Sequence, residues 1–350
     1  MKTQIIKIDP QNPEPGKISY CAKILRQGGL VAFPTETVYG LAANLSHKKA
    51  VERLNSVKKR TEGKPFSVHI AEKEKIEKYA MNLTPLVYKL IDKFWPGPLT
   101  LILPSPEGGT VGIRMPKNPI ALRFIYEAGV PIVAPSANIS GNSPPKNIDQ
   151  VLKDLNGLID LAIDGGPTEL GLESTILDLT IEPPKILRKG AIDEKEIKKI
   201  IKNKTLLFVC TGNSCRSVMA QALLKKMLEE RDDVEVLSAG TNAMMGMSVS
   251  ASTQELLLKE DIDVSSRTAQ MVSEMMLKKA DLILVMEKTQ ENKILEKHPS
   301  VKNRLYLLKE FAGIEGSDLN IPDPIGSSEE VYQEVFNLIK EAVGKIAAMI

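Results

Sequence analysis

The stretch Leu206–Met227, LLFVCTGNSCRSVMAQALLKKM, decides the fold of the second half of this 350-residue chain. Its apolar start ends at Cys210, a turn that contains Gly212 follows, and a helical pattern begins near Arg216. A buried strand that passes through a glycine-bearing turn into a helix is typical of a parallel α/β unit. The backbone N–H groups of such a turn, together with the helix N-terminus, form a cradle for an anion. The sequence therefore predicts a phosphate site in this turn.

The side chains of the turn indicate chemistry on that phosphate. Cys210 stands at its floor, where the positive end of the helix dipole favours the thiolate, which is the nucleophilic form. Arg216, six residues on, can donate two hydrogen bonds to phosphoryl oxygens, and Ser217 can donate its hydroxyl to the thiolate. Asp323 lies between two prolines in IPDPIG, where it could protonate a leaving group. These residues predict a cysteine-dependent phosphatase.

Both halves of the chain alternate short apolar runs with helical patterns. The runs are GGLVAF, PFSVHI, LTLILP, VPIVAPS and STILDL in the first half, then TLLFV, VEVLSAG, ADLILVM and NRLYLLKEF. This alternation predicts parallel α/β sheets in both halves. The polar helical segment AIDEKEIKKIIKNK separates the two series, so we place a boundary near Asn203 and expect domains over residues 1–203 and 204–350.

Composition narrows the class of protein. A net charge of +2 and 26% charged residues are ordinary for globular domains and too mild for a dedicated nucleic-acid binder. No apolar run approaches the ~20 residues that span a bilayer, and the N-terminus has no signal-peptide pattern. Three cysteines cannot form a paired disulfide framework, and Cys21 stands alone in a helical pattern as a core residue. We therefore expect a cytoplasmic protein that does not associate with membranes.

The second half resembles the low-molecular-weight tyrosine phosphatase family in VCTGNSCRS, the SAG at 238–240, ADLILVM and Asp323-Pro324. The resemblance implies Cys210 as nucleophile, Arg216 as the clamp on the transition state, and Asp323 as acid and then base. The remaining phosphate-loop residues that it implies are Thr211, Gly212, Asn213, Ser214, Cys215 and Ser217. The counterpart of Cys215 in the family can form a reversible disulfide with the nucleophile; a small buried filler is the alternative for this residue.

Within that family the chain looks closest to the bacterial protein-arginine phosphatases. These carry threonine where this chain has Ser214, whereas tyrosine-specific members carry a bulky aliphatic residue. Ile325 also replaces an aromatic residue found in many tyrosine phosphatases, and Val218 replaces a usual proline. We expect phosphorylated proteins as substrates, with phosphoarginine favoured. Tyrosine phosphatase, arsenate reductase and a non-catalytic phosphate sensor are the alternatives.

The first half has no nucleophile–base pair, but cations and hydroxyls lie at its strand ends. PTETVYGL, WPGPLT, PSANISG, STI and LRKGAI, in this order, resemble the YrdC-like threonylcarbamoyl-AMP synthases over residues 12–195. The resemblance implies a twisted α/β sheet and the substrates L-threonine, bicarbonate and ATP. The adenylate product would feed the threonylcarbamoyladenosine modification of tRNA, so the tRNA-modification machinery and tRNA are expected partners.

Position by position, the resemblance assigns residues to two sets. The threonine pocket comprises Thr37, His69, Arg114 and Ser174, with a main-chain contact at Ala134. The nucleotide contacts comprise Lys58, Arg60, Lys64, Thr110, Ser136, Pro144 and Arg188. Mg²⁺ that bridges the departing pyrophosphate is expected, although no carboxylate cluster identifies a protein metal site. A non-catalytic module that binds RNA through a basic concavity is the alternative for this half.

The boundary yields a direct prediction. Fragments 1–203 and 204–350 should each fold and keep their activity, because the boundary lies in a polar segment and not in a shared apolar core. Expression of both fragments, followed by circular dichroism and activity assays, measures this. Insolubility of both fragments would show that the two halves share a core.

Overall fold

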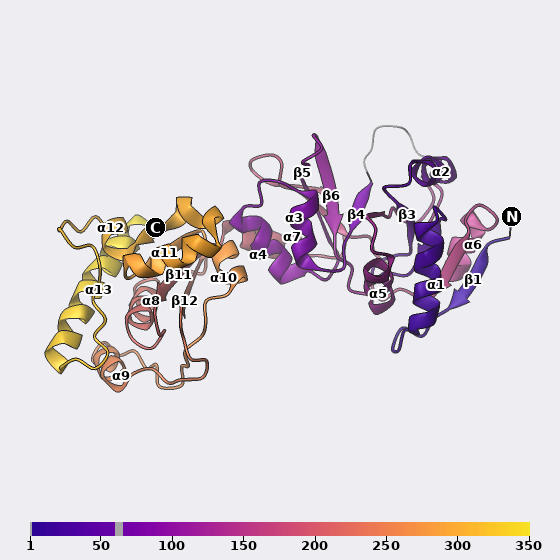
Figure 1. Ribbon diagram of the computed structural model, residues 1–350. Helices are drawn as coiled ribbons and strands as arrows, with labels where there is room; N and C mark the ends of the chain where they lie inside the picture. Colours follow the sequence, from indigo (N-terminus) through magenta and orange to yellow (C-terminus); the bar gives the residue numbers. More distant parts are fainter. Residues whose placement is uncertain (1, 60–65) are drawn as a thin grey trace. The chain divides into compact units, whose positions relative to one another are not determined.

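The computed structural model describes residues 2–59 and 66–350 of the chain (Figure 1). The chain divides into two compact units. One comprises Met1–Leu83 and Lys89–Ile201, and the other comprises Thr84–Tyr88 and Lys202–Ile350. The predicted fold class is confirmed, since each unit is built on its own sheet flanked by helices. The predicted domain boundary after residue 203 stays a prediction.

The first unit contains one mixed sheet, which has ten strands among the described residues in the order β1-β8-β2-β3-β7-β4-β6-β5-β9-β10. The strands are β1 Gln4–Lys7, β2 Val31–Phe33, β3 Gly40–Asn44, β4 Ser67–His69, β5 Leu99–Pro104, β6 Thr110–Arg114, β7 Ile132–Val133, β8 Leu161–Asp164, β9 Thr175–Asp178 and β10 Lys185–Arg188. The helices are α1 Pro15–Arg26, α2 Lys48–Lys58, η1 Lys73–Lys75, α3 Ile76–Tyr79, α4 Pro85–Phe94, α5 Pro119–Ala128, α6 Ile148–Leu155 and α7 Glu194–Lys202.

The prediction of a parallel sheet in this half was wrong. β1 and β2 run parallel to β8, β4 runs parallel to β6, and β5 runs parallel to β9. The pairs β2–β3, β3–β7, β4–β7, β5–β6 and β9–β10 are antiparallel. Only six residues separate β2 from β3, and six separate β9 from β10. A parallel crossover needs roughly a dozen residues or more, so these short connections permit only hairpin-like pairing.

An apolar cluster joins the helices α1 and α5 to the strands β2, β3 and β8 of this sheet. Phe33 and Phe124 are fully buried in it, with ring centroids 5.4 Å apart. Cys21 of α1 belongs to the same cluster and is fully buried, which agrees with its interpretation as a core residue. Burial raises the pKa of its thiol to about 12. Cys21 is therefore held as an uncharged thiol.

The second unit is a four-stranded parallel sheet in the order β12-β11-β13-β14, as predicted. Its strands are β11 Lys204–Cys210, β12 Val234–Gly240, β13 Leu282–Val285 and β14 Leu305–Leu307. Its helices are α8 Arg216–Met227, α9 Ala251–Leu258, α10 Glu274–Lys279, α11 Lys288–Lys297, η2 Pro299–Arg304, α12 Leu308–Phe311 and α13 Glu329–Met349. The segment NRLYLLKEF is shorter as a strand than expected, because α12 begins at Leu308.

The central strand β11 is apolar from Leu206 to Val209 because helices cover both of its faces. Leu206 and Phe208 belong to the cluster that includes residues of α8 and α13, whereas Leu207 and Val209 belong to a second cluster with residues of α10 and α11. Successive side chains of a strand point to opposite faces, so an unbroken apolar run fits a strand buried on both sides. This packing holds the carboxyl end of β11, where Cys210 lies, between its two neighbours.

In the part of the chain that the structure describes, no helix has the length and apolar character needed to cross a membrane.

Candidate active sites

The phosphate loop predicted from the sequence lies between β11 and α8. β11 ends at Cys210 and α8 begins at Arg216, so five residues form the turn. Cys210 is 2% exposed, and its Sγ lies 3.0 Å from Ser217 Oγ. The backbone N–H of Asn213 donates to the same sulfur at 3.2 Å. The thiol therefore sits inside the turn, with a hydroxyl and an N–H group directed at it.

Asn213 holds the turn in shape. Its backbone adopts the left-handed conformation, with φ of 53°, which asparagine tolerates better than most residues. Its side-chain Nδ2 donates to Ser217 Oγ at 3.0 Å and to Ser238 Oγ at 2.7 Å, and its Oδ1 accepts from the backbone N–H of Gln270 at 2.9 Å. Arg267 donates to the same Ser238 hydroxyl at 2.7 Å. One fully buried amide thus joins the phosphate loop to the end of β12 and to the segment before α10.

Gly240 ends β12 and lets that strand approach the loop. A Cβ atom at Gly240 would lie 2.5 Å from the carbonyl oxygen of Thr211 and 3.0 Å from the nitrogen of Asn213. The next residue, Thr241, donates its backbone N–H to the Cys210 carbonyl at 2.9 Å. Only glycine fits this close approach of two backbones. This constraint explains the glycine of the SAG motif in physical terms.

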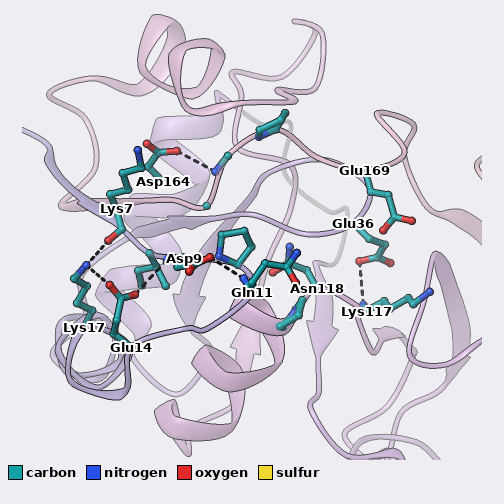
Figure 2. Close-up of a pocket in the computed structure, with 16 residues that line it drawn as sticks. Lys7, Asp9, Gln11, Glu14, Lys17, Glu36, Lys117, Asn118, Asp164 and Glu169 are labelled. Carbon is teal, nitrogen blue, oxygen red and sulfur yellow. Dashed lines mark hydrogen bonds and ion pairs between the residues drawn. The ribbon is translucent and has the colours of Figure 1, made fainter.

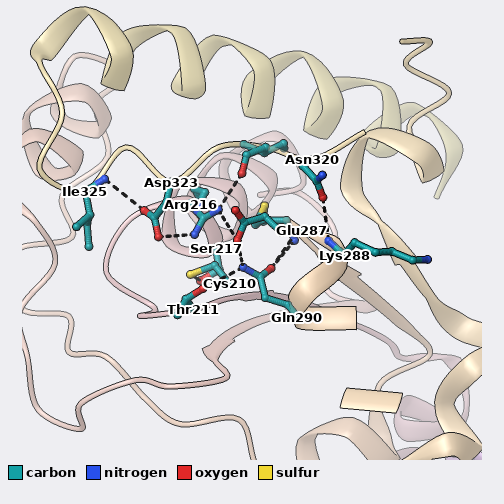
Figure 3. A network of polar contacts seen from close by, with 12 residues as sticks. Cys210, Thr211, Arg216, Ser217, Glu287, Lys288, Gln290, Asn320, Asp323 and Ile325 are labelled. Atoms are coloured by element: carbon teal, nitrogen blue, oxygen red, sulfur yellow. Dashed lines mark hydrogen bonds and ion pairs between the residues drawn. The ribbon is translucent and has the colours of Figure 1, made fainter. Parts of the chain in front are cut away.

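Arg216 is 1% exposed and contacts groups from two other segments (Figure 3). Its Nη1 donates to the Ile321 carbonyl at 2.8 Å and lies 3.2 Å from Glu287 Oε2. Its Nη2 donates to Asp323 Oδ2 at 2.5 Å. Its Nε is buried and has no hydrogen-bond partner among the described residues. The predicted clamp and the predicted acid are therefore in direct contact, and one N–H of the clamp is left without an acceptor.

Asp323 is more accessible than its partner. Its side chain is 39% exposed, and its Oδ1 accepts the backbone N–H of Ile325 at 3.3 Å (Figure 3). Ile325 is 57% exposed. The carboxylate thus lies at the rim of the loop, where it can meet a leaving group that approaches from solvent.

Cys215 is buried behind the loop, and its thiol is reduced in this structure, as is that of Cys210. Its Sγ lies 3.1 Å from Ser250 Oγ and 3.5 Å from the hydroxyl of Tyr332, a residue of α13. Burial, and after it the contact with Cys215, raises the pKa of Tyr332. Polar atoms of two helical segments thus meet this sulfur, and both the disulfide role and the alternative of a small buried filler stay predictions.

In the first unit, Thr37 and Arg114 form the centre of the predicted threonine pocket. Arg114 Nη2 donates to Thr37 Oγ1 at 2.7 Å and to Glu36 Oε1 at 2.7 Å. Thr37 Oγ1 also lies 2.8 Å from Thr35 Oγ1. All four side chains are at most 5% exposed, so the guanidinium charge is balanced by a buried carboxylate. Sequence reasoning did not identify Glu36 or Thr35, although both lie within PTETVYGL.

Ser174 and Arg188 form a second part of the same region. Arg188 Nη2 donates to Ser174 Oγ at 2.9 Å and its Nη1 donates to Glu173 Oε1 at 2.5 Å, while Ser174 Oγ lies 2.8 Å from Thr100 Oγ1. Burial lowers the pKa of Arg188; the Glu173 carboxylate opposes this shift, and the positive charge of Arg114 adds to it. The positive charge of Arg114 thus acts on Arg188, which indicates that the two guanidiniums lie near each other.

Lys58, at the end of α2, holds the PSANISG loop. Its Nζ donates to the carbonyl oxygens of Ser136 at 2.5 Å and of Asn138 at 2.6 Å, and it lies 3.3 Å from Asn138 Oδ1. Lys58 is 3% exposed, so its ammonium group is inside the fold. The structure therefore gives it a positioning role, and the part of Asn138 in this contact was not anticipated.

His69 lies beside Arg114, and Ala134 lies on the other side of β4. His69 ends β4 opposite Arg114 of β6, and the backbone N–H of Ala134 donates to the Ser67 carbonyl at 3.1 Å. The ring of His69 meets Phe33 edge-on, with centroids 6.3 Å apart. Burial, and after it the positive charge of Arg114, lowers the pKa of His69 to about 3. His69 is therefore a neutral side chain in this region.

The structure does not bring the other predicted nucleotide contacts together in one place. Thr110 is exposed and begins β6, whereas Arg114 ends it. At the rise of an extended strand the two residues are roughly 13 Å apart. Pro144 is half-buried next to Pro145, whose carbonyl accepts the backbone N–H of Tyr39 at 2.8 Å. Arg60 and Lys64 lie outside the described residues. The position of the predicted triphosphate site therefore stays a prediction.

A cavity of about 840 Å³ lies beyond Glu36 (Figure 2). The second carboxylate oxygen of Glu36 accepts the backbone N–H of Lys117 at 3.0 Å, and both residues line the cavity. None of the predicted site residues lines it. Over residues 2–59 and 66–350, no group of three or more histidine, cysteine, aspartate or glutamate side chains is arranged to hold a metal ion.

Comparison with known proteins separates the same two parts of the chain. Residues 23–190 match the family model Sua5/YciO/YrdC, described as telomere recombination. A Methanocaldococcus jannaschii relative is 35% identical over 208 residues, which cover 57% of this chain and 99% of the relative. The chain belongs to the Sua5/YciO/YrdC family.

Two further matches are with proteins of Pyrococcus abyssi. The chain is 46% identical over 197 residues to a threonylcarbamoyl-AMP synthase of this organism, a match that covers 54% of this chain and 58% of the relative. The chain thus spans just over half the length of that relative. The crystal structure of P. abyssi Sua5 complexed with L-threonine is 29% identical, with a TM-score of 0.55, over 87% of this chain and 99% of that chain.

The second unit is a low-molecular-weight phosphatase domain. Residues 205–350 match the family model of low molecular weight phosphotyrosine protein phosphatases. The YwlE arginine phosphatase of Geobacillus stearothermophilus is 31% identical, with a TM-score of 0.39, over 42% of this chain and 92% of that chain. One chain therefore carries a Sua5/YrdC domain followed by a phosphatase-family domain.

The low pKa of His69 predicts a pH dependence of stability. Below its ordinary pKa of 6.5 the unfolded chain binds a proton at this side chain, whereas the folded chain stays unprotonated down to about pH 3. The free energy of unfolding of the first unit should therefore fall between pH 6.5 and pH 3, by up to about 1.4 kcal/mol per pH unit from this residue. Trp95, the single tryptophan, lies in this unit, and its fluorescence in denaturant titrations provides the measurement.

His69→Phe and His69→Gln serve as controls for each other, since they differ in size and polarity but neither titrates. Both variants should lose less free energy of unfolding per pH unit than the wild type over this range. A slope in both variants that equals the wild-type slope would show that His69 does not titrate as its burial requires.

Proposed function

We propose that the first unit is a threonylcarbamoyl-AMP synthase that uses L-threonine, bicarbonate and ATP. The observation that carries this proposal is the buried contact of Thr37 with Arg114, next to His69 and in the electrostatic environment of Arg188. A hydroxyl and a guanidinium that meet in a buried region suit a small ligand with a hydroxyl and a carboxylate. The likeness to P. abyssi Sua5 complexed with L-threonine supports threonine as that ligand.

The proposed chemistry requires positioning more than covalent catalysis. The threonine amine attacks carbon dioxide and loses a proton, or attacks bicarbonate with loss of water, and an oxygen of the resulting carbamate attacks the α-phosphorus of ATP. The bond from that phosphorus to the bridging oxygen breaks, and pyrophosphate leaves. Arg188 and the predicted Arg60 would neutralise phosphate charge, while Arg114 orients the threonine carboxylate. Mg²⁺ would enter with the ATP phosphates, since the described residues form no metal cluster of their own.

A Thr37→Val variant tests this proposal. The substitution keeps the size of the side chain but removes the hydroxyl that accepts from Arg114, so threonine should bind roughly tenfold more weakly or worse. The measurement is pyrophosphate release from ATP, with and without threonine and bicarbonate. Thr180→Val, on the turn after β9, is the control and should behave as the wild type. Release that does not require threonine, or a normal KM for threonine in Thr37→Val, contradicts the assignment.

We further propose that the second unit hydrolyses phosphorylated proteins through a phosphocysteine intermediate. Cys210 thiolate attacks the phosphorus, the bond from phosphorus to the leaving atom breaks, and Asp323 gives its proton to the leaving group. Asp323 then accepts a proton from water, which displaces the cysteine and releases inorganic phosphate. The contacts of Cys210 with Ser217 and of Arg216 with Asp323 support these roles.

Phosphoarginine is the substrate class that the loop favours. Ser214 is 8% exposed in the wall of the loop, and its Oγ makes a long contact of 3.7 Å with Cys215 Sγ and no other hydrogen bond within the described residues, so it can accept an N–H of a phosphoguanidinium. Ile325, at the rim, cannot stack on a phosphotyrosine ring as an aromatic side chain would. An apolar residue at position 214 would leave guanidinium N–H groups buried without acceptors, which costs about 1–3 kcal/mol.

Substitution of Ser214 tests this preference. Ser214→Ile should lower kcat/KM for phosphoarginine peptides roughly ten- to a hundredfold and shift the preference toward phosphotyrosine peptides. Ser214→Ala removes the hydroxyl without added bulk and separates the two effects, and Cys210→Ser should abolish both activities. If the wild type hydrolyses phosphotyrosine peptides at least as efficiently as phosphoarginine peptides, the substrate is phosphotyrosine and the phosphoarginine assignment fails.

A further inference from the structure

The guanidinium of Arg216 has two edges in different surroundings. Nη1 faces the protein, since the Ile321 carbonyl lies at 2.8 Å and Glu287 Oε2 at 3.2 Å. Nε and Nη2 share the other edge, where, among the described residues, Nε has no partner and Nη2 has only Asp323. A phosphoryl group is bound best by two parallel N–H donors of one edge. The Nε–Nη2 edge, whose partner among these residues is the accessible carboxylate of Asp323 and not the protein interior, is thus the edge that can turn to substrate.

We propose that Glu287 and Gln290 are positioning residues that hold the Nη1 side of Arg216 and thereby turn its Nε–Nη2 edge toward the phosphoryl group. The inference rests on the proposed phosphatase function and extends it to two residues outside the phosphate loop. Glu287 is the second residue after the end of β13 and directly precedes α11, whereas Arg216 opens α8, so the contact joins two strand–helix connections of the sheet (Figure 3).

Gln290 fixes the carboxylate of Glu287. It is 2% exposed, and its Nε2 donates to Glu287 Oε2 at 2.9 Å and to Thr211 Oγ1 at 3.1 Å. Its Oε1 accepts the backbone N–H groups of Met286 at 2.9 Å and of Glu287 at 3.1 Å. A buried amide with both ends occupied has little freedom to move. Through Gln290, the start of α11 therefore holds both the first residue of the loop turn and the arginine that closes it.

The contact with Arg216 goes beyond helix capping. Glu287 and Gln290 form the capping box of α11, and capping requires only an acceptor oxygen at position 287. Glu287→Gln keeps that oxygen but removes the charge that attracts Nη1. The direction in which anion affinity changes in Glu287→Gln then distinguishes a positioning role of Glu287 from a purely electrostatic effect of its charge. Removal of a negative charge near a bound anion should tighten anion binding, whereas loss of a positioning contact should weaken it.

The test uses the full-length chain and two measurements. Calorimetric titration with tungstate, a tetrahedral oxyanion, gives a dissociation constant without turnover, and p-nitrophenyl phosphate hydrolysis gives kcat and KM. Glu287→Gln should bind tungstate roughly tenfold more weakly and lose roughly tenfold in kcat, and Glu287→Asp should restore part of both losses. Gln290→Leu should shift both quantities in the same direction. Glu296→Gln, an exposed residue of α11 with the same change of charge, is the matched control and should equal the wild type.

Each outcome decides one of the two proposals. Tighter or unchanged tungstate binding in Glu287→Gln overturns the positioning role, as does an equal loss in Glu296→Gln. Circular dichroism and thermal unfolding show whether each variant is folded. If Gln290→Leu is unfolded, the comparison of Glu287→Gln with Glu287→Asp provides the test. If the wild type binds tungstate but shows no hydrolysis that Cys210→Ser removes, the phosphatase function fails, while weaker binding in Glu287→Gln still upholds the positioning role. A wild type that does not bind tungstate overturns both.

Discussion

The buried charge of Arg216 is the constraint on which the phosphatase domain depends. An isolated guanidinium removed from water is strongly destabilising, so a side chain that is 1% exposed requires carboxylates and carbonyls around it. The chain supplies them from Glu287, Ile321 and Asp323, which lie more than 70 residues away in sequence. The junction of β13 and α11 and the loop before α13 must therefore pack against the phosphate loop for the fold to be stable. The same requirement brings the predicted acid to the predicted clamp.

The synthase-family domain meets the same constraint with two separate ion pairs. Arg114 is balanced by Glu36 and Arg188 by Glu173, and each carboxylate belongs to a segment that also contributes a hydroxyl, Thr37 or Ser174. Each ion pair thus places a ligand-sized hydroxyl beside a cation. β4 pairs with β6, which places His69 opposite Arg114. Because His69 is neutral, it adds no further positive charge to this region.

Several elements of the phosphatase domain could be predicted from the local sequence, because each depends on residues that are neighbours along the chain. The strand β11, the glycine-bearing turn and the start of α8 are contiguous, so their apolar run, Gly212 and helical pattern were sufficient to predict them. The mixed topology of the first sheet was missed, since apolar runs look alike in parallel and antiparallel strands buried on both faces. The short connections between β2 and β3 and between β9 and β10 carried the signal that could have corrected this.

The sequence by itself determined the types of chemical group: a cysteine and an arginine in one turn, and hydroxyls and cations at the strand ends of the first unit. It also determined the fold class, because the alternation of apolar runs and helical patterns reflects local periodicity. Only the tertiary structure decided the pairing of these groups: Glu36 with Arg114, Lys58 with the loop at Ser136, and Glu287 with Arg216. The physical reason is that a buried charge is satisfied by whichever group the packing brings within about 3 Å. That proximity is a property of the assembled sheets and helices, and no spacing along the chain encodes it.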